Sequence, residues 1–191
     1  MIGPTLVLAS ASPRRLALLA QIGIMPDRVI SPDVDEAPLR DELPRNYVRR
    51  LARAKAEAVA AQGCYVLAAD TVVAAGRRIL PKTESETEAR QCLTLLSGRR
   101  HRVMTATVLH APNGRKGERL VESVVGLSRL TEPQMTEYLA SEEWRGKAGG
   151  YAIQGRAAAF IRFLSGSYSN VVGLPLFETA QLLRGLGWPL P

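Results

Sequence analysis

The segment that decides the fold is LVLASASPRRLALLAQI, residues 6–22. Its first four residues, 6–9, are apolar and predict a short buried strand, and from Leu16 onward apolar residues recur at helical spacing. Ser12 suits a helix N-cap and Pro13 suits the first helical position, so the segment predicts a strand, a loop and a helix. Because the first turn of a helix leaves backbone N–H groups unpaired, this junction attracts anions.

Arg14 and Arg15 stand in the first turn of that helix, where the helix dipole disfavours positive charge. A bound phosphate would offset this unfavourable placement of positive charge. It would be held by the backbone N–H groups, the hydroxyls of Ser10 and Ser12 and both guanidinium groups. The alternative is that both arginines pair with the acidic residues between positions 33 and 36 and bind no ligand. The local sequence leaves both interpretations open.

Length and composition fit one globular domain over residues 1–191. Hydrophobic residues make up 46% of the chain and charged residues 23%, and the formal net charge is +7. A positive charge favours an acidic partner. The basic residues are spread as pairs and aromatic residues amount to only 5%, which argues against a nucleic-acid surface. A small phosphorylated molecule fits at least as well.

Cysteine use and hydropathy indicate the compartment. Cys64 and Cys92 lack metal-ligand spacing and a nearby pair of histidines, so we expect neither a disulfide framework nor a structural zinc site. No apolar run approaches the ~18 residues of a membrane span, and the N-terminus has no basic region of the kind that begins a signal peptide. We therefore expect a cytoplasmic protein that does not bind a membrane.

The second informative segment is VLAADTVV, residues 66–73, which predicts a central strand. Aspartate is disfavoured in strands and costly to bury without a partner, yet Asp70 interrupts this one. A strand would hold its carboxylate rigidly, as a metal ligand or a general base requires. A buried ion pair with an arginine is the alternative interpretation.

Further elements follow from local patterns. Apolar spacing predicts a helix over 47–61 that carries Lys55, and taken alone this lysine is a solvated helix residue. Residues 81–83 are predicted to form a loop and residues 156–164 a strand.

A glycine-rich stretch lies near the C-terminal third of the chain. Residues 144–155 contain four glycines, which predicts a loop whose backbone closely approaches something else. Lys147 and Gln154 are the polar side chains of this stretch that can form hydrogen bonds with a ligand.

Taken together, these segments resemble one family, the Maf nucleotide pyrophosphatases. The matching segments are ASASPRR (9–15), VDE (34–36), RLARAKA (50–56), AADTVV (68–73), LPKT (80–83), LSGRRH (96–101), KAGGYAIQG (147–155) and SYSNVVGLPL (167–176). They span nearly the whole chain in order. The joint occurrence of the arginine pair and the strand aspartate in this arrangement favours the functional interpretation of both.

The resemblance implies an elongated Maf/ITPase-like α/β fold, in which helices flank a mixed, curved β-sheet and two lobes surround a central cleft. It also implies a homodimer. The implied activity is that of a nucleotide diphosphatase, which hydrolyses a nucleoside triphosphate to the monophosphate and pyrophosphate with a divalent cation, Mg²⁺ or Mn²⁺. The implied partner is therefore a nucleotide and not a nucleic acid.

The site roles join the resemblance to the chemistry of the reaction. Attack of water on the α-phosphorus needs cations to neutralise the triphosphate and a carboxylate to position metal and water. The candidate cations are Arg14, Arg15, Lys55, Lys82 and Lys147. Asp70 matches the proton acceptor of the family, and Asp70 with Glu36 is also the candidate metal-ligand set.

Three positions match those that set specificity in the dTTP/UTP branch of the family: Arg14, Thr71 and Gln154. The branch that acts on 7-methylguanosine triphosphate carries glutamate in place of Gln154 and has no lysine where Lys147 stands. A neutral amide can both donate and accept, as the edge of uracil or thymine requires. The alternatives are a Maf pyrophosphatase of another specificity and a nucleotide-binding regulator of septum formation.

Two positions depart from the family pattern. Pro81-Lys82-Thr83 stands where the family usually has glycine-lysine-proline, and Glu142 replaces the glycine that usually precedes Glu143. Both departures concern loop geometry and leave the charged site residues in place.

Overall fold

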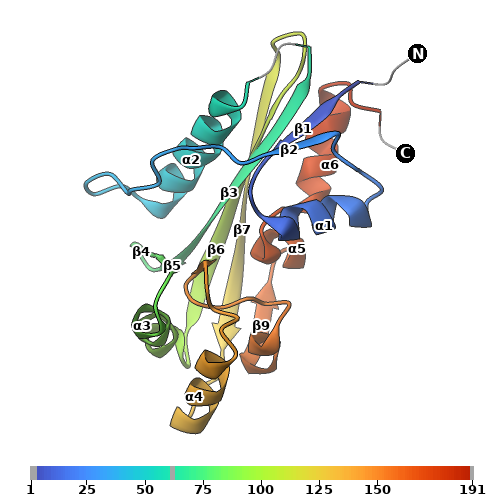
Figure 1. The fold of residues 1–191 in the computed structure, drawn as a ribbon. Coiled ribbons are helices and arrows are strands. Elements are labelled where there is room, and N and C mark those ends of the chain that lie inside the picture. Colours follow the sequence, from blue (N-terminus) through green and yellow to red (C-terminus); the bar gives the residue numbers. More distant parts are fainter. Residues whose placement is uncertain (1–3, 61–62, 190–191) are drawn as a thin grey trace.

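The computed structural model describes residues 4–60 and 63–189 (Figure 1). These residues form a seven-stranded sheet whose long central strands run along an elongated molecule. The strand order is β2 (Arg28–Ile30), β1 (Leu6–Ala9), β3 (Tyr65–Ala75), β6 (Arg100–His110), β7 (Lys116–Leu127) and β9 (Ile161–Ser165), and β4 (Arg78–Leu80) pairs with the end of β3. β1 is parallel to β2 and β3, and the other pairs are antiparallel. The sheet is mixed, as the resemblance implied.

Helices cover both faces of the sheet (Figure 1). On one face, α2 (Pro44–Ala58) packs its apolar side against β3 and β6. The other face is covered by α1 (Pro13–Gln21), α3 (Glu86–Leu96), α4 (Glu132–Ala140), α5 (Tyr168–Val172) and α6 (Leu176–Gly185). Alternation along β1 divides its residues between the two cores, with Leu6 and Leu8 in the larger one and Val7 and Ala9 in the smaller.

An interruption in the pairing of β3 opens the sheet in its middle. β1 ends at Ala9, opposite Ala68, whereas β4 first pairs at Val73. Asp70 and Thr71 fall in this gap, where β3 keeps β6 as its neighbour on one side only. Because successive side chains of a strand point to opposite faces, Asp70 faces α2 while Thr71 faces α1 and the segment after α5.

Three segments differ from the sequence-based expectations. Lys82–Thr83 is not a loop but the strand β5, which pairs with β8 (Lys147–Ala148). The expected strand 156–164 begins as a 3-10 helix, Arg156–Phe160, and becomes β9 only from Ile161, because a short apolar run does not by itself distinguish helix from strand. The helix predicted over 47–61 starts earlier, with Pro44 in its first turn, and ends at Ala58, while residue 61 lies outside the described residues.

Both departures from the family pattern have a structural counterpart. Thr83 is fully buried, and its hydroxyl donates to the carbonyl oxygen of Trp144 at 2.7 Å, which ties β5 to the loop before β8. Glu142 has a φ of 56°, in the left-handed region that favours glycine. The loop therefore keeps a glycine-like backbone at the cost of some strain.

No helix in residues 4–60 and 63–189 is both long and apolar enough to span a bilayer.

Candidate functional site

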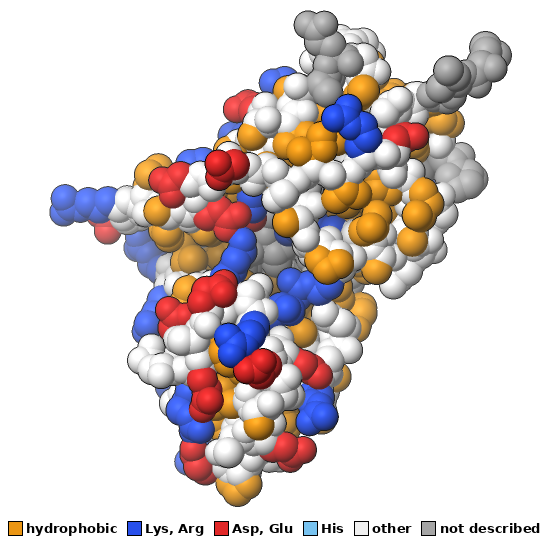
Figure 2. Space-filling view, in the orientation of Figure 1, with side chains coloured by type: hydrophobic (Ala, Val, Ile, Leu, Met, Phe, Trp, Pro, Cys, Tyr) orange, Lys and Arg blue, Asp and Glu red, His pale blue; other side chains and the backbone are white. Residues whose placement is uncertain are grey.

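A cavity of about 570 Å³ opens beside the interrupted part of β3. Figure 2 shows this face of the molecule hollowed between its upper and lower parts, with basic side chains around the hollow. Every site residue expected from the sequence lines the cavity: Ser10, Ser12, Arg14, Arg15, Glu36, Lys55, Asp70, Thr71, Lys82, Lys147 and Gln154. Six separate segments of the chain therefore meet there.

Lys55 joins the two carboxylates of the cavity. Its Nζ lies 2.5 Å from Oδ1 of Asp70 and 2.6 Å from Oε1 of Glu36. Lys55 is 6% exposed and Asp70 is 3% exposed, because this side of α2 packs onto β3. The interpretation of Lys55 as a solvated residue was wrong, and the buried partner of Asp70 is this lysine and not an arginine.

Glu36 is held between two ammonium groups, because Lys82 also forms an ion pair with it. Partial burial opposes ionisation of this carboxyl, but the hydrogen bonds and charges of Lys55 and Lys82 lower its pKa to about 2. The four side chains thus form a continuous chain of alternating charge, Lys82, Glu36, Lys55 and Asp70, along one wall of the cavity.

The carboxylates of Asp70 and Glu36 fit a divalent cation that a substrate helps to bind. Within the part of the chain that the structure describes, no group of three or more His, Cys, Asp or Glu side chains could hold a metal ion. Mg²⁺ is commonly bound by one or two carboxylates together with waters and substrate phosphates. Two carboxylates that converge on a common cation, here the Lys55 ammonium, match that smaller ligand set.

Arg15 is buried and fixed by three hydrogen bonds. Its Nε donates to the carbonyl oxygen of Gly173 at 2.8 Å, Nη1 to Oγ of Ser10 at 3.0 Å, and Nη2 to Oγ1 of Thr71 at 3.2 Å. Burial lowers the pKa of this guanidinium. None of the ion pairs among the described residues joins Arg14 or Arg15 to positions 33–36, so that alternative was wrong.

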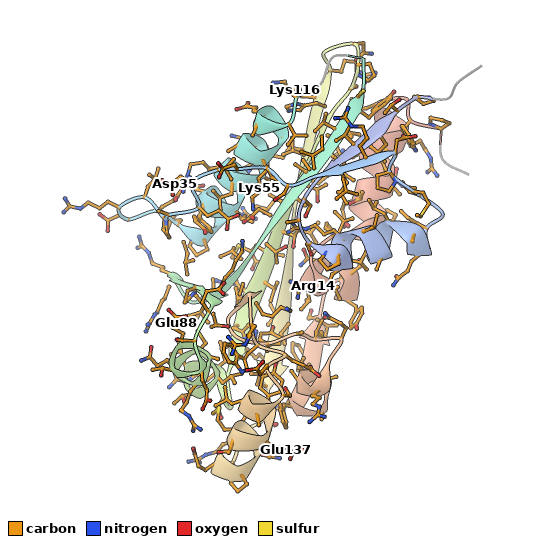
Figure 3. The ribbon with its side chains drawn as sticks, viewed as in Figure 1. Arg14, Asp35, Lys55, Glu88, Lys116 and Glu137 are labelled. Atoms are coloured by element: carbon orange, nitrogen blue, oxygen red, sulfur yellow. The ribbon has the colours of Figure 1, made fainter. Side chains whose placement is uncertain are left out.

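Arg14, by contrast, is only partly buried at the start of α1 and lines the cavity, and this burial lowers the pKa of its guanidinium. Figure 3 shows Arg14 and Lys55 on either side of β3, from α1 and α2 respectively. The paired arginines of the sequence therefore differ in burial, although both line the cavity: Arg15 is buried and held by hydrogen bonds, and Arg14 is partly buried.

The two serines of the loop leave hydroxyl groups available to a ligand. Oγ of Ser10 accepts hydrogen bonds from the N–H of Ser12 and from Arg15, so its own proton remains free to donate. Ser12 is the N-cap residue of α1, but its side chain forms no capping hydrogen bond. An anion bound at this helix end would meet both hydroxyls.

The glycine-rich stretch also lines the cavity. Nζ of Lys147 donates to the carbonyl oxygen of Arg145 at 2.8 Å, and partial burial together with the charge of Arg14 lowers the pKa of this lysine. Gly149 has a φ of 70°, and a Cβ added there would lie 2.9 Å from the side chain of Val73. The close approach that the glycines predicted is therefore an approach to β3.

Sequence reasoning missed three contributors to the cavity. Arg145 and Tyr151 line it from the glycine-rich stretch, and Gly173, whose carbonyl oxygen accepts from Arg15, lines it from the segment after α5. The hydroxyl of Tyr151 lies 2.7 Å from Nε2 of the buried His101, which fixes the tyrosine ring. The repeated glycines marked the stretch that holds Arg145 and Tyr151, but no local signal marked a backbone carbonyl.

Comparison with known proteins places the chain in a family. The sequence profile of the family described as Maf-like protein matches residues 5–186. The chain belongs to the Maf family. Among its members, the dTTP/UTP pyrophosphatase of Granulibacter bethesdensis is 62% identical over 199 residues, which cover 96% of this chain and 93% of that protein. The dTTP/UTP pyrophosphatase of Rhodospirillum rubrum is 63% identical over 188 residues, covering 97% of this chain and 89% of that protein.

The fold extends beyond the Maf family. The solved structure of a HAM1 protein from Coxiella burnetii matches 95% of this chain and 99% of that chain, with a TM-score of 0.51 and 16% sequence identity. At that identity the likeness concerns the fold alone. It agrees with the mixed α/β architecture that the motifs implied.

Proposed function

We propose that this protein is a pyrophosphatase that hydrolyses dTTP and UTP to the nucleoside monophosphate and pyrophosphate. The observation that carries the proposal is that every residue matched to the Maf site lines one cavity, in a chain more than 60% identical to dTTP/UTP pyrophosphatases. The reaction is the hydrolysis of a phosphoanhydride, which needs charge neutralisation and an oriented water.

The basic side chains of the cavity bind the triphosphate. Arg14 and Lys147 line the same cavity close enough for their charges to interact, and Lys82 lies beside Glu36. The hydroxyls of Ser10 and Ser12 and the N-terminus of α1 add neutral donors on the same side. A polyphosphate in this cavity would relieve the mutual repulsion of these cations, which are otherwise only partly paired.

Asp70 accepts the proton of the attacking water. The water oxygen bonds to the α-phosphorus, the bond from that phosphorus to the oxygen bridging to the β-phosphorus breaks, and pyrophosphate leaves. β3 holds the Asp70 carboxylate rigidly, and Lys55 fixes its orientation through the ion pair at 2.5 Å. Asp70 and Glu36 would hold a divalent cation, Mg²⁺ or Mn²⁺, which supplies charge neutralisation to the phosphates when bound.

Gln154 and Thr71 read the base. The Gln154 amide can donate to the O4 carbonyl and accept from the N3–H of a pyrimidine, and the 5-methyl group of thymine lies away from that edge. Mismatched buried polar groups lead us to expect UTP and dTTP to be preferred over CTP by roughly 5- to 150-fold. Gln154 and Lys147 both differ from the pattern of the branch that acts on 7-methylguanosine triphosphate, which disfavours that alternative.

A regulator of septum formation would need only to bind a nucleotide. The position of Asp70 beside the cationic groups favours turnover instead, because a carboxylate at that position weakens phosphate binding unless it serves the reaction.

The homodimer, the cytoplasmic location and the single domain over residues 1–191 stay predictions. Sedimentation of the purified protein tests the first of them.

The decisive experiment is an assay of pyrophosphate release from each common nucleoside triphosphate, and from 7-methylguanosine triphosphate, in the presence of Mg²⁺. We expect UTP and dTTP to give the highest kcat/KM. A preference for 7-methylguanosine triphosphate would overturn the specificity, and nucleotide binding without release of pyrophosphate would favour the regulator.

A further inference from the structure

The hydroxyl of Thr71 belongs to a buried chain of hydrogen bonds that crosses the sheet. Thr71 on β3 lies directly opposite Thr105 on β6, and their Oγ1 atoms are 2.9 Å apart. Nη2 of Arg15 lies 3.2 Å from the Thr71 oxygen, and Oγ1 of Thr105 lies 3.0 Å from the carbonyl oxygen of Asn170. Thr105 and Asn170 are fully buried, so neither has water as an alternative partner.

The two ends of this chain fix the direction of the protons that Arg15 and Thr105 contribute to it. A guanidinium can only donate and a carbonyl oxygen can only accept. The proton of Thr105 therefore points to Asn170, because that buried carbonyl would otherwise lose this partner. The Thr105 oxygen is then free to accept the proton of Thr71, while Thr71 itself accepts from Arg15.

Thr71 has no proton left for a ligand. Among the described residues, the other acceptor of this proton is the carbonyl oxygen of Gly173, at 3.4 Å, which is farther away than the Thr105 oxygen at 2.9 Å. A proton donated to either oxygen is unavailable to a ligand. One lone pair of the Thr71 oxygen remains, and Thr71 lines the cavity. Toward the cavity, this hydroxyl is an acceptor.

Gln154 has no such restraint. Its side chain is exposed and forms no hydrogen bond with the rest of the described chain, so its amide is free to turn over. An amide that turns over can meet either uracil or cytosine, because rotation exchanges its donor and its acceptor. Gln154 alone therefore discriminates weakly between the two bases.

We infer that Thr105 is a positioning residue for base selection, because it takes up the Thr71 proton and leaves Thr71 as an acceptor that favours bases carrying N3–H. This inference rests on the proposed function and deepens it. Uracil and thymine present N3–H, which this acceptor would receive in place of the Gln154 oxygen, leaving the Gln154 amide to meet the group at position 4. The unprotonated N3 of cytosine would instead place two lone pairs against each other.

The test compares kcat/KM for UTP and CTP in the Thr105→Val variant and in the wild type. Valine keeps the shape but removes the nearer acceptor and leaves only the longer 3.4 Å contact with Gly173, so the Thr71 hydroxyl can rotate and donate to N3 of cytosine. The UTP-to-CTP ratio should then fall by about fivefold or more, as expected when one mismatched hydrogen bond is relieved. Thr105→Ser restores the hydroxyl and should restore the ratio.

Thr107 provides the matched control. It lies two residues further along β6, on the same face, is equally buried, and its hydroxyl has no hydrogen-bond partner among the described residues. Thr107→Val removes a buried hydroxyl from the same strand without touching the chain that ends at Asn170. We expect the UTP-to-CTP ratio of this variant to equal that of the wild type.

A measurement on the wild type needs no folded variant. Pseudoisocytidine triphosphate presents the cytosine edge with a proton on N3, and an acceptor at Thr71 should make it a better substrate than CTP. The inference is overturned if Thr105→Val keeps the wild-type ratio, or if CTP and its N3-protonated isostere are hydrolysed equally well. Failure of the proposed function would look different, because the wild type would then not hydrolyse UTP at all.

Discussion

Lys55 and Asp70 form a buried ion pair between α2 and β3, with 2.5 Å between Nζ and Oδ1. Their side chains are 7% and 4% exposed, so both charges have lost most of their hydration. A buried pair of this kind contributes little net stability, whereas removal of one partner leaves a costly unpaired charge. The proposed catalytic carboxylate is therefore held by a cation that the fold itself places.

Asp70→Asn should abolish turnover and leave the fold intact. The substitution preserves the shape of the side chain and removes the charge that proton transfer requires, while Lys55 keeps Glu36 as its partner. We expect kcat for UTP to fall by about 100-fold or more. Circular dichroism and thermal melting check the fold. A residual rate above about a tenth of the wild-type rate, roughly 1.4 kcal/mol of barrier, would exclude an essential role for Asp70.

Lys55→Met should lower turnover and make the melting temperature more sensitive to Mg²⁺. Without the ammonium, the carboxylates of Asp70 and Glu36 repel each other, and a bound cation that relieves the repulsion stabilises the folded state. Thermal melting with and without millimolar MgCl₂ measures this directly. Lys82→Met is the control, since it removes the other ammonium from Glu36 but leaves Asp70 paired. Equal Mg²⁺ shifts in all three proteins would contradict a cation site at these carboxylates.

Arg14→Ala and Arg15→Ala should both impair hydrolysis but should differ in stability. Arg15 makes three hydrogen bonds within the protein, so its loss should lower the free energy of unfolding by about 2–4 kcal/mol. Arg14 is only partly buried and forms no hydrogen bond or ion pair with the rest of the described chain, so its loss should change stability by no more than about 0.5 kcal/mol while raising KM for UTP. Urea unfolding and steady-state kinetics separate the effects. Unchanged kinetics in Arg14→Ala would refute its role as a phosphate clamp.

Gln154→Glu should reduce turnover of UTP and dTTP more than turnover of guanine nucleotides. A carboxylate only accepts hydrogen bonds, so it opposes the O4 carbonyl of a pyrimidine and suits the donor-rich edge of guanine. The measurement is kcat/KM for UTP, dTTP and 7-methylguanosine triphosphate. Gln134→Glu makes the same chemical change at the start of α4, where glutamate also completes a capping box, and should leave all three values unchanged. A uniform loss for all substrates in Gln154→Glu would count against base recognition.

The pH dependence of stability should contain a contribution from Glu36. Its pKa is about 2 in the folded protein, below the ordinary value of 4.5. The ionised carboxylate of Glu36 therefore stabilises the folded state relative to the unfolded state. That stability is present above the ordinary pKa and is lost as the pH falls toward about 2. In urea unfolding, wild type should exceed Glu36→Gln in stability at about pH 6, and the difference should shrink by about pH 3. A difference that does not change with pH would show that the ion pairs with Lys55 and Lys82 contribute no such stability.

The sequence by itself determined the elements with strong local signals. Apolar runs and a proline in the first helical turn fixed β1 and α1, and the apolar run around Asp70 fixed β3. All candidate site residues came from the family motifs, and all of them line the cavity. The order of the motifs along the chain identifies the family even where each motif alone is ambiguous. Periodicity further showed which face of α2 is apolar.

Only the tertiary structure decided what those residues face. Lys55 is buried because its side of α2 meets β3, and periodicity does not say what an apolar face will cover. Arg15 meets Gly173, which is 158 residues away in the chain, and Thr71 meets Thr105 through the register of β3 with β6. β5 and β8 become strands only because they meet each other. These contacts depend on long-range pairing, which local propensity and spacing do not encode.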